Sequence, residues 1–297
     1  MKQTKKVSKK AKKGRTASRA IAKRVARPSR APAQRMTDHL RIVPLHHPKP
    51  MVAYEDLAHD DHDLYDGKVH AAPTNAQLVY NGGPLLTAVE VYTIFWGESW
   101  QANSKAVALM KQINDFFKDI VKSSLITQLN EYSVPGKKIG FGSFVGTKVV
   151  TAAAPVNSIT DAQVATALKK WLSSKVAPKG STNRLYFIYL EPGIVSVMGG
   201  SKSCQNYCGY HNHTGSIYYA VMPYPTCAGC LGGMSLIDAI TGTSSHELCE
   251  AITDPVPGSG WYDQANGEIG DICAWSFKKI GNWNVQLEWS NQQGKCV

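Results

Sequence analysis

A chain of 297 residues, 43% of them hydrophobic, is long enough to bury a substantial core and is expected to form one large domain. No stretch approaches the roughly 20 consecutive apolar residues of a membrane-spanning helix, which argues against an integral membrane protein. The formal net charge of +11 is concentrated at one end: residues 1–36 hold 14 of the 33 Lys and Arg and none of the 22 Asp and Glu, which leaves a net charge of −3 for the remainder.

Residues 1–36 are predicted to form a disordered basic arm, because a segment with so few large apolar residues cannot offset the entropy cost of ordering. Such an arm attracts nucleic acid, anionic lipid and other polyanions without sequence specificity. A solvated tail, or a start codon assigned too far upstream, accounts equally well for this composition. No secretory signal peptide is expected, since the most apolar stretch, AIAKRVA (20–26), is interrupted by Lys23 and Arg24.

Residues 37–75 are predicted to be an extended linker that precedes a folded domain at 76–297. The linker holds six of the nine His, mixed with Asp and Pro, and shows no sustained periodicity. Clustered His can bind a metal ion, but these have no fixed ligand spacing, which favours a polar linker.

From residue 76 onwards, segments of strand and helix character alternate along the chain. A Gly-Gly turn in LVYNGGPLL (78–86) leads into a buried strand at 87–97, which is rich in β-branched and aromatic residues. The segment 104–132 is predicted to be an amphipathic helix, because apolar residues recur at spacings of three and four. These residues are Val107, Met110, Ile113, Phe116, Phe117 and Ile120.

The same alternation continues to the C-terminus. Further strands are predicted at 137–150, 184–192, 216–223 and 283–290, and further helices at 161–174 and 234–255. The last helix is stopped by Pro255 and has a weak point at Gly242. This order predicts an α/β or α+β fold, in which helices pack on a mixed sheet.

The cysteines lie in the C-terminal third and are predicted to form disulfides. Six of the seven can pair, while Cys249 is left as a small buried residue of a helix. The candidates are Cys204, Cys208, Cys227, Cys230, Cys273 and Cys296. The first four also have a spacing close to that of a four-Cys zinc site. Disulfides are favoured because Cys273 and Cys296 suit a bridge that holds the C-terminus. Disulfides in turn indicate an oxidising compartment.

The run SHELCE (245–250) carries the strongest chemical signal. It places His246 and Glu250 four residues apart on one face of the predicted helix, with Glu247 beside them. An HExxH helix supplies two metal ligands and a general base in this way, and here Glu250 stands in the position of the second His. The pattern predicts a zincin-like domain around a central HExxE helix, although a bare HExxE run also occurs on ordinary helices.

The residues that follow this helix offer carboxylates for a third ligand. Asp254, Asp263, Glu268 and Asp271 all lie on a stretch rich in turn-forming residues. Asp271 is predicted to be the third ligand, with Glu268 as the alternative.

This ligand set predicts a zinc site, although a set rich in oxygen also admits Ca²⁺ or Mn²⁺. A metal ion lowers the pKa of a bound water to about 7, and Glu247 would accept the proton as the water attacks a peptide carbonyl. His211 and His213 in YHNHTG could approach the site, but they are interpreted as polar loop residues.

Several motifs, in order along the chain, resemble one protein family. SHELCEAITDP, GWYD and EIGDIC are similar to the HExxE, N/D-P, AWY and EIxDxC motifs of the EXORDIUM-like proteins, also called phosphate-induced proteins. YNGGPLLTAVEVYTIFWGESW resembles the entry segment of that family, SCQNYCGYHNHTG its Cys-Gly-(Phe/Tyr)-His block, and VQLEWSNQQGKC its last strand and cysteine. The resemblance covers roughly residues 77–297.

The resemblance implies an extracellular or cell-wall-associated protein, without an assigned reaction. The HExxE run, and not the resemblance, predicts a zinc-dependent metallopeptidase that hydrolyses peptide bonds. The alternative is a non-catalytic module that binds a peptide or a cell-wall polymer, in which the HExxE cluster is structural. The basic arm stands where members of the family have a signal peptide.

Overall fold

The structure, a computed structural model, describes residues 42–44 and 75–297. The predicted basic arm (1–36) and most of the predicted linker (37–75) lie outside these residues. The described part is a mixed α/β fold with six α-helices, in agreement with the predicted alternation of strands and helices. Within these ranges, no helix combines the length and the hydropathy needed to cross a membrane.

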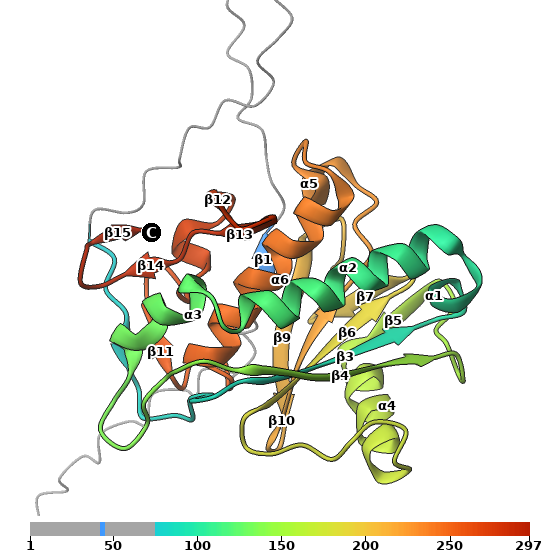
Figure 1. The fold of residues 1–297 in the computed structure, drawn as a ribbon, viewed down its shortest axis with the longest axis horizontal. Coiled ribbons are helices and arrows are strands. Elements are labelled where there is room, and N and C mark those ends of the chain that lie inside the picture. The colour runs from blue at the N-terminus through green and yellow to red at the C-terminus, as the bar shows by residue number, and fades with distance from the viewer. Residues whose placement is uncertain (1–41, 45–74) are drawn as a thin grey trace, which may run out of the picture. The chain divides into compact units, whose positions relative to one another are not determined.

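A six-stranded mixed sheet organises the fold (Figure 1). Its strands lie in the order β1–β9–β10–β6–β3–β4, and the four from β10 to β4 are parallel. β9 is antiparallel to β10, and β1 is antiparallel to β9. In that order the strands span Ile42–Pro44, Tyr207–Thr214, Ile217–Met222, Arg184–Leu190, Glu90–Trp96 and Ser143–Val150. β1 therefore comes from the predicted linker and pairs with β9 at one edge of the sheet.

Helices cover both faces of this sheet, as Figure 1 shows. α2 (Ser104–Ile120) and α6 (Leu236–Thr253) pack on one face, and α4 (Asp161–Ser173) packs on the other. Successive side chains of a strand point to opposite faces, so in β3 Phe95 enters the first core and Ile94 the second. The apolar runs that predicted buried strands are thus covered on both sides.

The helix predicted at 104–132 is shorter than expected, because it ends at Ile120. Ser123 adopts an extended conformation, and its side chain accepts the backbone N–H of Leu125, which starts a new helix. The rest of the segment forms α3 and the 3₁₀ helix η1, at Ser124–Gln128 and Leu129–Tyr132.

The buried stripe of α2 differs from the prediction near the start of the helix. Val107 is 37% exposed, whereas Ala106 and Leu109 are buried. The later part of the stripe is buried against the sheet as expected, and comprises Ile113, Phe116, Phe117 and Ile120. The helix is therefore turned slightly from the orientation that the apolar spacing indicated.

α6, which carries the HExxE run, is buried along most of its length. Residues 239–253 are all buried, since the sheet, α2 and a hairpin surround them. The hairpin consists of β12 (Phe277–Ile280) and β13 (Trp283–Gln286). Gly242, predicted to be a weak point, permits this packing, because a Cβ atom there would lie 2.7 Å from the Phe277 ring.

Shorter elements complete the described part. The strand predicted at 283–290 is divided, because β13 pairs with β12 whereas β14 pairs with β15. Two short helices are α1 (Ser99–Ala102) and α5 (Ala228–Leu231), and η2 is a 3₁₀ helix at Asp271–Cys273. The remaining strands, β2, β5, β7, β8, β11, β14 and β15, span Val79–Tyr80, Ser158–Thr160, Val195–Met198, Ser201–Lys202, Trp261–Tyr262, Trp289–Ser290 and Lys295–Cys296.

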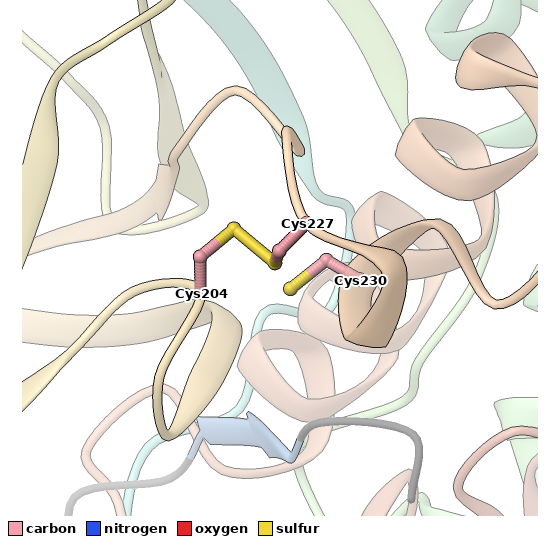
Figure 2. Close-up of side chains that lie close together, drawn as sticks. All are labelled: Cys204, Cys227 and Cys230. Atoms are coloured by element: carbon pink, nitrogen blue, oxygen red, sulfur yellow. A yellow bond between two sulfur atoms is a disulfide. The ribbon is translucent and has the colours of Figure 1, made fainter. Parts of the chain in front are cut away.

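Three cysteine pairs lie at disulfide distance, and they are Cys204–Cys227, Cys208–Cys230 and Cys273–Cys296. Figure 2 shows the first bridge, with the Cys230 side chain of α5 beside it. Cys249 is buried and forms no disulfide, as predicted. Because the first four sulfur atoms are bonded in pairs, they are not available as four thiolate ligands, which argues against the four-Cys zinc site. The bridges are compatible with an extracellular protein.

Removal of the bridge near the C-terminus is expected to destabilise the fold. The Cys273→Ala/Cys296→Ala double variant loses a cross-link between residues 23 apart in sequence, which lowers the free energy of unfolding by about 3 kcal/mol. Urea unfolding of the variant and the wild type measures this difference. Cys249→Ala is the control for loss of a sulfur without loss of a bridge. A double variant as stable as this control would contradict the prediction.

Candidate metal centre

The HExxE run gathers three ionisable side chains inside the protein. Helical spacing places His246 and Glu250 one turn apart on α6, with Glu247 next to His246. All three residues are 0% exposed. Burial of a charged group is costly unless the group is paired or binds a metal ion. The elements packed around this turn of α6 are therefore expected to supply partners.

His246 and Glu250 lie close together, and Asp271 of η2 completes a first group of ligand-type residues. The His246 Nε2 and Glu250 Oε1 atoms are 3.0 Å apart. One ligand-type atom from each of the three residues lies within 4.8 Å of the others. Gly270 permits the approach of η2, because a Cβ atom there would be 2.7 Å from His246 Nδ1. The structure thus brings together the three residues that the sequence singled out as ligands.

The prediction that His211 and His213 are polar loop residues is wrong, since both belong to β9. His211 is fully buried, and its Nδ1 atom is 3.2 Å from Glu247 Oε2 and 3.4 Å from Glu250 Oε2. These three residues form a second group whose ligand-type atoms lie within 4.8 Å of one another. His213 is partly buried near the end of the strand, with Nδ1 3.2 Å from the carbonyl oxygen of Gly215.

The other ring nitrogen of His211 is held by the backbone. Its Nε2 atom lies 3.1 Å from the carbonyl oxygen of Asp254, the residue that caps the C-terminus of α6. An N–H donated to a carbonyl fixes the tautomer of an imidazole and directs its second nitrogen elsewhere. Histidines that bind metal ions usually have such an outer contact. The backbone of α6 therefore orients His211 Nδ1 towards the carboxylates.

The remaining acidic residues after α6 have different surroundings. Glu268, predicted as the alternative third ligand, is buried with its Oε1 atom 3.7 Å from His211 Nε2. The Asp254 side chain accepts the backbone N–H groups of residues 258–260. The Asp263 side chain accepts N–H groups within its own turn. The two aspartates therefore shape the loop that carries Glu268 and Asp271.

The histidines and glutamates of the two groups shift one another's pKa values. Burial alone would lower the pKa of His211 and His246, but the neighbouring carboxylates outweigh it and raise both to about 10. Burial raises the pKa of Glu247, whereas the two histidines outweigh burial and lower the pKa of Glu250. In a metal-free chain the imidazoles are expected to be protonated, so a metal ion must displace those protons.

Glu288 is a further buried carboxylate, and no sequence pattern pointed to it. It is 0% exposed, and its backbone pairs with that of Val297. Burial raises the pKa of Glu288 well above its usual range, and Cys249 of α6 lies beside it. Glu288 is therefore a buried carboxyl group beside the centre that belongs to neither group of ligand-type residues.

The buried atoms of the centre fit a metal ion. Among the described residues, both oxygens of Glu250, Glu247 Oε1 and both ring nitrogens of His246 have no aligned hydrogen bond. The 3.0 Å separation between His246 Nε2 and Glu250 Oε1 suits two ligands that each lie about 2.0–2.2 Å from one ion. Nitrogen and oxygen donors admit Zn²⁺, and the carboxylates also suit Mn²⁺ or Ca²⁺.

No protein-family model, curated protein or solved structure matches this chain. The resemblance to EXORDIUM-like proteins therefore rests on the sequence motifs alone. His211 belongs to one of those motifs, SCQNYCGYHNHTG, in which the family block also has a His. That motif drew attention to His211 in the sequence but did not indicate that it lies in the centre.

A cavity of about 10 Å³, room for about one water molecule, lies beside α6 near the centre. It is lined in part by Thr243, one helical turn before Glu247, and by Tyr224. The backbone of Gly209 on β9 packs against the same turn, because a Cβ atom there would lie 2.8 Å from Thr243 Cγ2 and 3.3 Å from Glu247 Oε1. The cavity therefore gives a peptide no access to Glu247 unless β9 and α6 move apart at Gly209.

Proposed function

We propose that the protein is a zinc-dependent hydrolase of the peptidase type, with a zincin-like centre built on α6. One observation carries this proposal: Glu247 adjoins two buried ligand-type residues of α6, His246 and Glu250, and the partly buried Asp271 of η2 converges with them. The three disulfides support an extracellular place of action, which the resemblance to EXORDIUM-like proteins also implies.

Each residue of the centre has a distinct role in the proposed hydrolysis. His246, Glu250 and Asp271 would hold the ion, and a bound zinc ion supplies Lewis acidity and a water of pKa near 7. Glu247 accepts the proton of the attacking water through Oε1, which has no hydrogen-bond partner among the described residues. His211 positions Glu247 by its contact with Oε2.

The burial of the centre favours a second function. His246, Glu247 and Glu250 are 0% exposed, and Gly209 closes the approach from the nearby cavity. A peptide bond could reach the ion only after a local opening of the fold. In this second function the ion is structural, and the protein is a non-catalytic module that binds a peptide or a cell-wall polymer on its surface.

Both proposed functions require a bound metal ion, so the metal content of the purified full chain tests both of them. The wild type is expected to contain a bound divalent ion, and His246→Ala to contain about one ion fewer per chain, because a ligand is lost. Elemental analysis measures both contents. His213→Ala is the matched control, since this histidine lies on β9 outside both ligand groups.

An ion content that His246→Ala leaves unchanged, or a wild type without bound metal, would contradict the proposed site. Incubation of the metal-loaded chain with a mixture of peptides then separates the two functions. Cleavage that a chelator abolishes supports the hydrolase, whereas a loaded chain that cleaves no peptide supports the binding module.

A further inference from the structure

We propose that the centre holds two metal ions, bridged by the carboxylate of Glu250. This inference rests on the proposed metal site and adds a second position to it. The first group of ligand-type residues is His246, Glu250 and Asp271, and the second is His211, Glu247 and Glu250. Glu250 is the residue that the two groups share.

The two oxygens of Glu250 face different histidines. Oε1 is 3.0 Å from His246 Nε2, and Oε2 is 3.4 Å from His211 Nδ1. Two-metal hydrolytic sites hold their ions about 3.5–4 Å apart, a spacing that a carboxylate can bridge with one oxygen on each ion. Both Glu250 oxygens are buried without an aligned hydrogen bond among the described residues, so both are available to ions.

The second position has the outer contact expected of a metal ligand. His211 Nε2 lies 3.1 Å from the Asp254 carbonyl, which leaves Nδ1 to bind an ion beside Glu247 and Glu250. The residues of the first position lie on α6 and η2, and the sequence predicted them. The second position also needs His211, which lies on β9. Glu247 can be both a ligand of the second ion and a general base. Its Oε2 atom faces His211, and its Oε1 atom has no hydrogen-bond partner among the described residues and can accept a proton.

Loading with Mn²⁺ tests the bridge in the wild-type full chain and needs no substitution. Two Mn²⁺ ions that share a carboxylate are magnetically coupled, and their electron paramagnetic resonance spectrum differs from that of isolated ions. The metal-depleted chain, given two equivalents of Mn²⁺ and freed of excess metal, is expected to hold two ions and to show the coupled spectrum.

Substitution of each histidine then assigns the positions. His211→Ala is expected to leave one ion per chain and an uncoupled spectrum, and His246→Ala to do the same through loss of the other ion. His213→Ala is the matched control and is expected to keep both ions. Circular dichroism of each variant shows whether it retains the fold.

The outcomes separate this inference from the proposed function. A single ion that His246→Ala removes and His211→Ala leaves in place would overturn the second position and retain the first. Two ions without magnetic coupling would overturn the Glu250 bridge. A wild type that binds no Mn²⁺ and no Zn²⁺ would overturn both proposals.

Discussion

Glu247→Gln is expected to lower kcat/KM for peptide hydrolysis by about 10²–10⁴-fold, while the ion that depends on His246 stays bound. Glutamine keeps the shape of the side chain but cannot accept a proton from the attacking water. The site is suited to this role because Glu247 Oε1 is buried and has no hydrogen-bond partner among the described residues. Hydrolysis of a peptide that the wild type cleaves, measured together with metal content, gives both quantities.

The matched control for this variant is Glu98→Gln, which changes an exposed glutamate at the start of α1 in the same way. It is expected to leave hydrolysis unchanged. Activity that Glu247→Gln retains in full would show that another group accepts the proton. Activity lost together with the His246-dependent ion would show that Glu247 acts as a ligand at the first position and would remove the argument for a general base.

The metal-free chain is expected to lose stability as the pH rises from about 6.5 towards 10. The folded state raises the pKa of His211 and His246 to about 10, above the value near 6.5 of an unfolded histidine. The folded state therefore binds more protons in this window, and its stabilisation, complete below pH 6.5, disappears as the imidazoles lose their protons. A loss of at least about 2 kcal/mol is expected, since each unit of pKa shift is worth about 1.4 kcal/mol.

Urea unfolding of the chelator-treated chain at pH 6.5 and pH 9 measures this effect. Added Zn²⁺ is expected to restore stability mainly at the higher pH, because metal ligation requires neutral imidazoles. His213→Ala is expected to retain the pH dependence, whereas His211→Ala and His246→Ala weaken it. A metal-free chain whose stability rises over this window would contradict the assigned pairing of the two histidines with Glu247 and Glu250.

The ligand-type residues of α6 could be predicted from the sequence because their arrangement is local. A helix places residues four apart on one face whatever the rest of the fold does, so His246 and Glu250 had to lie together. Asp271 was expected from its acidic, turn-rich setting. Its position next to His246 depends on Gly270, whose lack of a side chain lets η2 approach the imidazole ring.

His211 could not be placed in the same way, because its position is set by long-range contacts. It reaches Glu247 only because β9 pairs with β10 and the sheet packs on α6. The strand itself, YCGYHNHT, contains a glycine and ends in polar residues, so it lacks the alternation and β-propensity that identified the other strands. The early end of α2 was missed for a different, local reason, since apolar residues continue past the Ser123 cap.

The pairing of β1 with β9 has a consequence for any shortened form of the chain. Ile42–Pro44 occupies the edge of the strand that carries His211, Val43 packs beside the Cys208–Cys230 bridge, and the Trp275 indole N–H donates to the Pro44 carbonyl. A chain cut back to residue 76 would expose unpaired N–H and C=O groups along β9, which invite strand-to-strand association between molecules. The smallest form that keeps this edge covered begins at or before Ile42.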